Sequence, residues 1–426
     1  MFVLGGFDII RDMKKWMCSF LAITALAATA RDYDVRRFGA VGDGAVMDTV
    51  AIQSAIDACA ANGGGRVVLD DGRFLSGTIT LKSGVELHLG VTAVLQGSTS
   101  CDDYPERTNL QHVVSANLPR ARNACFIYAE RAHDIAITGR GTIDCAGAAF
   151  VRERPQGSRG KWVSFERIPG LLTPPRVVFF AGCSDVKVVD VKMVNQPAGW
   201  SYWIHDCDRV AFDRCTILAD LRYPNNDGIH VNCSRDVLIS NCRIETNDDS
   251  IIVRANSRSL AENRPCERVT VANCSLRSHC SCIRVSYLND GVVRSCVFSN
   301  LVMNDSQIGI RVDLPKFSEI PDRGREKSLV RDLTFSCVDM QRVDVPLSFK
   351  IADAPDTLCD AVEDVRFIGV TARGGRRAEF RGRPSSPLRR FVFTACDIEL
   401  DEAPVFACCD GFRYDGNTFN VKERGK

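Results

Sequence analysis

The chain has 426 residues, of which 45% are hydrophobic, and a formal net charge of +1 from 54 basic and 53 acidic side chains. The balanced charge, without any basic block, argues against a nucleic-acid partner. A chain of this length usually forms two or three domains, although elongated all-β folds of this size occur as single units.

The first 30 residues have the features of an export signal. Met13 is followed by two lysines and an apolar run, and the small residues Ala28–Ala30 resemble a cleavage site. The run is too short to span a bilayer, and a buried N-terminal helix is the alternative interpretation. We expect residues 1–30 to be a signal peptide, with the coding start at Met13, and the mature chain to be secreted or periplasmic.

One amphipathic helix is predicted near the mature N-terminus, in the segment "DTVAIQSAIDACAANGGG". Asp48 or Thr49 is placed to cap its start, and the glycines at 63–65 end it. Its apolar face consists of Ile52, Ala55, Ile56 and Cys59. We expect this helix to cap one end of the fold.

Short alternating strands follow, and from about residue 176 they recur as one unit of two strands joined by a polar turn. Successive units start 24, 26, 33 and 24 residues apart, at Cys183, Cys207, Cys233, Cys266 and Asp290. A repeat of this length, made only of strands and turns, predicts a parallel β-helix. A sandwich or barrel would explain the strands but not the recurring unit.

Many of the 20 cysteines recur in one local pattern of the repeat, as in "RCTI", "NCRI", "NCSL", "SCVF" and "ACDI". This placement predicts small buried thiols stacked in successive coils, with one or two disulfides at most. A metal centre is not expected, because no CxxC pair occurs and His279, Cys280 and Cys282 do not complete a ligand set.

The spacing of the acidic residues predicts that they converge. Asp227 precedes one alternating strand, and Asp248 and Asp249 precede the next, one coil later. One coil along the chain is one strand spacing in space, about 4.8 Å. His279 and Arg311 should lie one and two coils further on. Insertions at residues 101–125, 147–175 and 313–328 are expected to wall a groove beside them.

Three close carboxylates divide their proton affinities, because like charges at short range cannot all ionise cheaply. One then remains a proton donor while the others stay anionic, which is the equipment for glycoside hydrolysis. The alternative interpretation is a set of solvated carboxylates at turns.

The chain resembles a known family in roughly residues 33–345. The N-terminal segments "YDVRRFGAVGDG" and "GRGTIDCAG" carry the general likeness. The specific elements are "NND" at 225–227, "NDDSIIVR" at 247–254, "SHC" around His279 and "IRVD" from Ile310. These resemble glycoside hydrolase family 28, the polygalacturonase family. The resemblance implies an all-β fold, a single-stranded right-handed parallel β-helix with an N-terminal capping helix, and one catalytic domain over residues 31–426.

The resemblance also implies roles for the acidic residues. Asp248 would be the general acid, and Asp227 and Asp249 would hold and activate water, which inverts the anomeric centre. His279 would tune the charge of these carboxylates. The implied activity is cleavage of a galacturonan- or rhamnogalacturonan-type pectic chain by a monomer without a metal or other cofactor.

The implied substrate-binding residues are Asn225, Arg254, Arg311 and Asp313. Asn225 would orient Asp227, and Arg311 would hold a uronate carboxylate through a two-pronged contact. Asp313, however, stands where the family has a lysine, and an aspartate there would repel a uronate or neutralise Arg311. His279 also departs from the pattern, because Ser278 and Cys280 replace the flanking glycines.

Several residues near the predicted site have two possible interpretations. Trp200, Tyr202 and Trp203 are either sugar platforms or core residues, and Arg284, Tyr287, His230 and Arg254 either line the groove or lie elsewhere on the surface. Two other functions stay open: a polysaccharide lyase or epimerase on the same scaffold, and a β-helix that binds glycans without catalysis.

Overall fold

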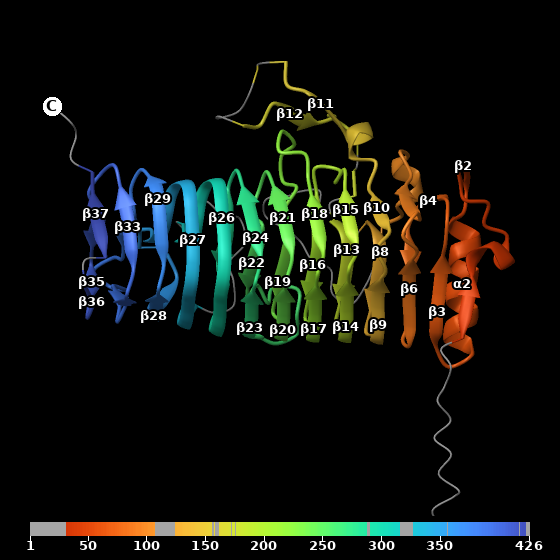
Figure 1. Ribbon diagram of the computed structural model, residues 1–426. Coiled ribbons are helices and arrows are strands. Elements are labelled where there is room, and N and C mark those ends of the chain that lie inside the picture. Colours follow the sequence, from red (N-terminus) through yellow and green to blue (C-terminus); the bar gives the residue numbers. More distant parts are fainter. Residues whose placement is uncertain are drawn as a thin grey trace, which may run out of the picture. The chain divides into compact units, whose positions relative to one another are not determined.

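The computed structural model describes residues 31–106, 124–155, 157, 162–171, 173–174, 176–287, 290–315, 327–355, 357–416 and 418–422. The expected signal peptide, residues 1–30, lies outside them. The unit from Asp32 onward is a right-handed parallel β-helix, in which the chain winds through three parallel sheets (Figure 1). This is the fold that the repeat predicts.

Each of the three sheets gains one strand from nearly every coil. The first contains β1 (Asp32–Asp34), β3 (Gly65–Leu69), β6 (Val85–Leu89), β9 (His133–Thr138), β14 (Ser184–Val189), β17 (Asp208–Asp213), β20 (Arg235–Ser240) and β23 (Cys266–Ala272). The second contains β2 (Asp43–Met47), β4 (Arg73–Ser76), β7 (Val94–Gly97), β10 (Thr142–Asp144), β15 (Lys192–Val194), β18 (Thr216–Leu218), β21 (Arg243–Thr246) and β24 (Ser275–Ser278). The third contains β5 (Ile79–Thr80), β8 (Cys125–Glu130), β13 (Arg176–Ala181), β16 (Trp200–His205), β19 (Ile229–Asn232), β22 (Ile251–Arg254) and β25 (Ser281–Val285).

The later coils continue all three sheets. Two long strands, β26 (Val292–Leu314) and β27 (Ser328–Ile351), each run around a whole coil. They are followed by β28 (Cys359–Ile368), β29 (Thr371–Gly375), β30 (Glu379–Arg381), β31 (Leu388–Arg389), β32 (Val392–Thr394), β33 (Asp397–Leu400), β34 (Val405–Ala407), β35 (Cys409–Asp410), β36 (Arg413–Asp415) and β37 (Phe419–Val421).

The core consists of like residues stacked from coil to coil. In the first sheet, the register pairs Val186 with Val210, Val210 with Val237, and Val237 with Val269. All four are essentially inaccessible to solvent. Because parallel strands place equivalent positions side by side, a repeated apolar pattern in the sequence becomes a continuous apolar column.

The cysteines belong to these columns. The structure describes 19 cysteines, and most of them are buried. Cys215, Cys242 and Cys274 precede strands that pair in register, and their thiols donate to carbonyl oxygens such as those of Val188 and Ala272. The expectation of stacked thiols is confirmed for the described residues.

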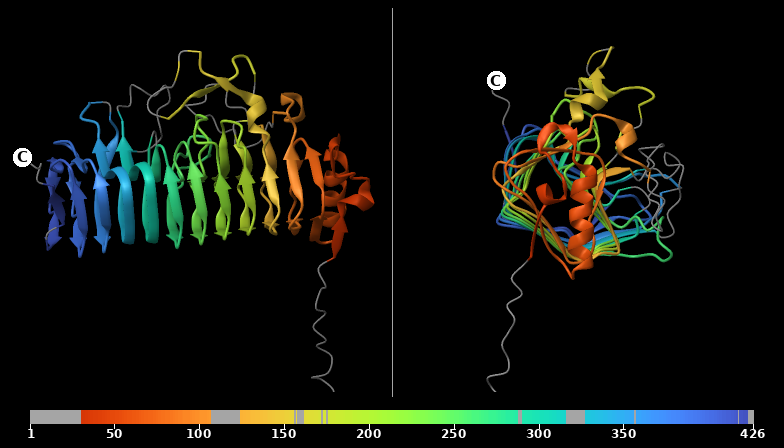
Figure 2. Two further views of the ribbon diagram at one scale, coloured as in Figure 1. Left: turned by 45° about the horizontal axis from the view of Figure 1, so that its top comes forward. Right: turned by 90° about the vertical axis from the view of Figure 1, so that its right-hand side faces the viewer.

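The predicted helix is present as α2 (Thr49–Ala61), and it lies across the first coil (Figure 2, right). The four predicted apolar residues face the core. Asp48 is the N-cap residue, as predicted, but its carboxylate makes no capping hydrogen bond to the helix. It accepts hydrogen bonds from the backbone N–H groups of Val41 at 2.7 Å and Gly42 at 3.0 Å instead. Asp48 therefore ties the preceding loop to the helix start.

We expect Asp48→Ala to lower the free energy of unfolding by about 1–3 kcal/mol, because two backbone donors beside a buried carboxylate lose their acceptor. Urea denaturation followed by circular dichroism measures the change. Asp43→Ala is the control, because Asp43 also accepts two backbone N–H groups but is exposed. An effect as small as that of the control would contradict the anchoring role.

One predicted insertion lies beside the corners that connect the second sheet to the third. Residues 147–155 and 162–171 form the short helix η3 (Gly147–Phe150) and an antiparallel pair, β11 (Val151–Glu153) and β12 (Phe165–Arg167), beside the stack (Figures 1 and 2). The short helix η1 (Val35–Phe38) follows β1. In the insertion that begins at residue 101, the structure describes the short helix η2 (Cys101–Asp103), which follows β7. Residues 107–123 and 316–326, which carry most of the other two insertions, lie outside the described residues.

In the described part of the chain, no helix combines the length and the apolar character that crossing a membrane requires.

Candidate active site

The third sheet places the predicted acidic residues at one edge. Its register aligns Ile229 with Ile251, Ile251 with Ile283, and Ile283 with Ile310. The corners that precede these strands carry Asp227, then Asp248 and Asp249. A cavity of about 250 Å³ opens there, close to the lower end of small-molecule sites at roughly 300 Å³. Its lining is Trp200, Asn225, Asp227, His230, Asp248, Asp249, Ile252, Arg254, Cys280, Arg284, Tyr287 and Arg311.

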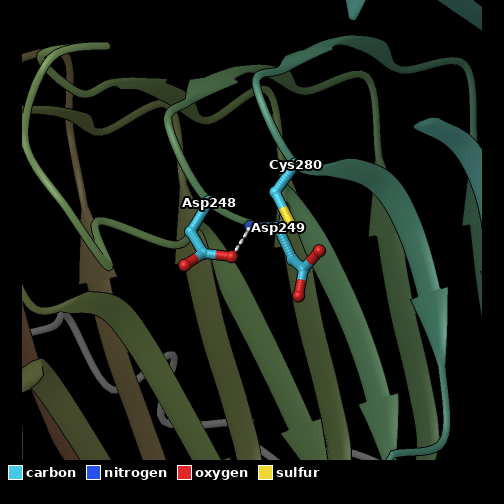
Figure 3. A group of neighbouring side chains, drawn as sticks. All are labelled: Asp248, Asp249 and Cys280. Atoms are coloured by element: carbon cyan, nitrogen blue, oxygen red, sulfur yellow. Dashed lines mark hydrogen bonds between the residues drawn. The ribbon is translucent and has the colours of Figure 1, made fainter. Parts of the chain in front are cut away.

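Asp248 is held at the mouth of the corner by two donors. Its carboxylate accepts from the side-chain amide of Asn225 at 3.2 Å. It also accepts from the backbone N–H of Asp249 at 3.0 Å, the contact drawn in Figure 3. Burial, together with the charge of Asp249, raises the pKa of Asp248 above the ordinary aspartate value. A carboxyl group with this shift keeps its proton at a pH where an exposed aspartate has lost it.

Asp249 has the opposite shift. Burial alone would raise its pKa, but the guanidinium of Arg284, 2.6 Å from Oδ2, and the charge of Arg311 outweigh burial and lower it. Its side chain is 2% exposed, and Oδ1 has no hydrogen-bond partner among the described residues. Two adjacent carboxyl groups therefore have pKa values shifted in opposite directions, so the two need not be ionised together at one corner.

Asp227 is the third carboxylate, and it faces a buried histidine. His230 Nε2 lies 2.9 Å from Asp227 Oδ2, and both side chains are almost fully buried. Burial and the neighbouring charges of Asp248 and Asp249 raise the pKa of Asp227 well above its ordinary value. Burial and nearby arginines lower the pKa of His230, which is therefore neutral. Asp227 Oδ1 has no partner among the described residues.

Two predicted residues make contacts other than those expected. The amide of Asn225 donates to Asp248 rather than orienting Asp227, because Asn225 sits at a corner with φ +53° that turns its side chain toward the next coil. His279 does not line the cavity. Its ring stacks on Trp162 from the insertion, with centroids 4.1 Å apart, and its Nδ1 lies 3.3 Å from the carbonyl oxygen of Leu221.

The cations beside the carboxylates are arginines. Arg284 binds Asp249, and its guanidinium lies 4.0 Å from the centre of the Tyr287 ring. Arg254 donates to the buried carboxylate of Asp290, with a shortest distance of 2.8 Å. Arg311 pairs with Asp313, two residues further along the same strand. The neutralisation of Arg311 that the sequence suggested is therefore present.

Cys280 occupies the place beside His279 and faces the aspartates. One ligand atom from each of Asp248, Asp249 and Cys280 lies within 4.8 Å of the others (Figure 3). Such a cluster matches some metal sites, but Arg284 and Arg311 place two positive charges against it, and burial raises the pKa of the Cys280 thiol well above its ordinary value. The donor set therefore fits a protonated thiol better than a metal ligand.

The aromatic residues divide between cavity and interior. Trp200 lines the cavity and stacks on His230 at 4.1 Å. Tyr202 is a core residue, and Trp203 is buried against Trp200 at 4.7 Å. One of the three aromatic candidates is therefore positioned to contact a ligand.

Sequence reasoning gave little weight to three contacts that shape the site. The sequence suggests only that His230 and Arg284 could line the groove. It does not indicate that their partners are Asp227 and Asp249. Arg167 comes from the insertion, and its guanidinium donates to Asn225 Oδ1 at 3.2 Å and to the carbonyl oxygen of Ala198. No repeat pattern signals this last contact, because the insertion is not part of a coil.

This edge combines a proton-holding carboxyl, an ionised carboxylate and a third acid within one cavity on a β-helix, which is an arrangement for acid–base catalysis. Comparison with known proteins assigns the family. The model of glycosyl hydrolases family 28 matches residues 59–351, which is more than half of the chain. The chain belongs to this family.

Relatives and solved structures agree with this assignment. The chain is 25% identical over 300 residues to a probable polygalacturonase of Vitis vinifera, covering 68% of this chain and 59% of the relative. It is 24% identical over 386 residues to an exo-poly-alpha-D-galacturonosidase of Dickeya chrysanthemi, covering 82% and 62%. The chain thus spans about three-fifths of the length of these relatives. A hyperthermoactive exopolygalacturonase from Thermotoga maritima shares the fold, with a TM-score of 0.70 and 20% identity over 92% of both chains.

Proposed function

We propose that this chain hydrolyses a glycosidic bond in a pectic polysaccharide or oligosaccharide, with Asp248 as the general acid. The observation that carries the proposal is the opposite shift of two neighbouring carboxyl groups, in which Asp248 holds its proton while Asp249 is ionised. Membership of a glycoside hydrolase family supports this reaction, and the polygalacturonase relatives support a pectic substrate.

In this mechanism, Asp248 protonates the leaving glycosidic oxygen from the mouth of the cavity. Asp249 acts as the base, because Arg284 keeps it ionised. Asp227 supplies a second acceptor for the same water, since Oδ1 of Asp227 and Oδ1 of Asp249 are both buried without a partner among the described residues. A water bound to both oxygens would attack from the side opposite to the leaving group and invert the anomeric centre.

One distance favours an alternative course for the same hydrolysis. The closest oxygens of Asp248 and Asp249 lie within 4.8 Å, whereas the acid and base of inverting enzymes are typically about 6.5–9.5 Å apart. Retaining enzymes, in which the second carboxylate is a nucleophile, have separations of about 5–5.5 Å. We favour inversion because Asp227 provides the additional acceptor, and the stereochemical outcome distinguishes the two courses.

The pH dependence of kcat should follow the two shifts. Asp249, with a lowered pKa, stays ionised as the pH falls below the ordinary aspartate range, and Asp248, with a raised pKa, stays protonated above it. We therefore expect a bell-shaped profile whose two limbs lie on either side of that range. Asp248→Glu should move the high-pH limb while leaving the low-pH limb in place. A single limb insensitive to this change would contradict the assignment.

A panel of pectic oligosaccharides tests the reaction itself. We expect release of new reducing ends without an unsaturated product that absorbs in the ultraviolet, and without an effect of chelator. An absorbing product would indicate the lyase alternative. Binding of the oligosaccharides without any release would indicate a glycan-binding β-helix.

We further propose that residues 1–30 direct export, that the mature chain from Arg31 is secreted or periplasmic, and that it acts as a monomer. The charged start, apolar run and small residues of the N-terminal segment support export. Light scattering of the purified mature chain and sequencing of its N-terminus after expression in a bacterial host test these statements.

A further inference from the structure

Each of the three arginines that line the cavity is already bound to a carboxylate. Arg254 is paired with Asp290, Arg284 with Asp249, and Arg311 with Asp313. The cavity lining also contains two carboxyl groups that are not paired with an arginine, Asp227 and Asp248.

The three lining arginines therefore supply no net positive charge of their own. Three guanidiniums balance the carboxylates of Asp249, Asp290 and Asp313 even when Asp227 and Asp248 are both protonated, and any ionisation of those two makes the sum negative. Arg167, from the insertion, is a fourth cation whose charge acts on Asp227 and Asp248, but it does not line the cavity, and its guanidinium donates to Ala198 and Asn225. A free uronate carboxylate would enter this site without an uncommitted cation in the described lining.

The Arg311–Asp313 pair differs from the other two in its exposure. Both of its side chains are 19% exposed, whereas Arg254, Arg284 and their partners are 10% exposed or less. The two residues are two positions apart on β26, so both side chains lie on the same side of the strand. This pair is therefore the part of the arginine set that a sugar would meet first.

The geometry around Arg311 suits an uncharged acceptor. Nη2 is committed to Asp313, Nη1 lies 3.8 Å from the Cys280 sulfur, and Nε is buried without a partner among the described residues. A carbonyl or hydroxyl oxygen can accept from Nη1, whose contact with the sulfur is long, without bringing a second negative charge against Asp313. A free carboxylate would have to displace Asp313 or lie beside it, and like charges at an interface cost affinity.

We propose that the sugar unit bound against Arg311 carries no free carboxylate, being an esterified uronate or a neutral sugar, and that Asp313 excludes the free uronate. This inference rests on the proposed function, because it assumes that the cavity binds a pectic chain.

The test compares oligogalacturonates, their methyl esters and oligosaccharides with alternating neutral units. For the wild type, we expect kcat/KM for an uncharged unit to exceed that for the free acid by at least about tenfold, since like-charge contacts are costly. Asp313→Asn should reduce this ratio by raising kcat/KM for the free acid, and Asp313→Lys should reduce it further. Asp305→Asn is the matched control, because Asp305 lies on the same strand in an exposed pair with Arg342.

A wild-type preference for the free acid, or a ratio unchanged in Asp313→Asn, would overturn the inference. Calorimetric binding in the Asp248→Asn background separates it from the proposed function. If the wild type cleaves no substrate but the variant binds the uncharged oligosaccharide more tightly than the free acid, the proposed hydrolysis is wrong and the inference stands. If the free acid binds equally or better, or if neither binds, the inference fails. The methyl ester and neutral arms identify which uncharged unit is preferred.

Discussion

Asp248→Asn should reduce kcat by about 10²–10⁴-fold on any substrate that the wild type cleaves, which is the typical contribution of a positioned general acid. An amide of the same shape can keep one of the two hydrogen bonds that Asp248 accepts, but it has no proton of suitable acidity to transfer to the leaving oxygen. The loss should be smaller for a substrate with an activated leaving group, because such a group needs less protonation. Initial-rate kinetics on both kinds of substrate measure the difference.

The same variant should not be less stable than the wild type. The raised pKa of Asp248 means that its ionised form is disfavoured in the folded state, by burial first and then by the charge of Asp249, and asparagine removes that cost. Thermal unfolding at neutral pH should show an equal or higher Tm. Asp236→Asn is the control, because Asp236 is an exposed partner of Arg268 on the same coil as Asp248. Full activity of Asp248→Asn would contradict the role of Asp248.

Arg284→Met should lower the free energy of unfolding by about 3–5 kcal/mol at neutral pH, because it leaves the carboxylate of Asp249 buried without its cation. The same change should raise the pKa of Asp249 and so move the low-pH limb of kcat upward. The stabilising effect of the pair is present while Asp249 is ionised and is lost as the pH falls through its lowered folded-state pKa. The difference in stability between wild type and variant should therefore shrink in acid.

A double-mutant cycle isolates the pair from other effects of the substitution. Arg284→Met combined with Asp249→Asn should be less destabilised than the sum of the single variants, because no charge is left unpaired. Arg268→Met provides the comparison, since its exposed pair with Asp236 should contribute only about 0–1 kcal/mol. Additive effects of the two changes at 284 and 249 would show that Arg284 does not act through Asp249.

The coil spacing predicted the convergence of Asp227, Asp248 and Asp249 because main-chain register in a parallel β-helix is set by the repeat. It could not predict side-chain partners at the corners. Asn225 has a positive φ and turns toward Asp248, and His279 is drawn toward Trp162, which belongs to the insertion. The alternation of strand residues assigns a face but not a contact, so it does not predict the pairing of Arg284 with Asp249.

The start of helix α2 likewise shows that the sequence predicts an element but not the hydrogen-bond partners of its side chains. The apolar face and the bounds of α2 followed from period and glycine signals. The use of Asp48 did not, because its carboxylate serves two backbone N–H groups in the loop before the helix rather than the helix itself. A cap residue can be recognised from sequence, whereas the donors it serves depend on where the adjoining loop returns.

The stereochemistry of hydrolysis tests the central claim most directly: that a proton-holding Asp248 and an ionised Asp249 act with Asp227 upon one water molecule. Proton NMR of the first product formed from a pectic oligosaccharide should show the anomeric configuration opposite to that of the cleaved bond. Retention of configuration would contradict the account and would make Asp249 a covalent nucleophile.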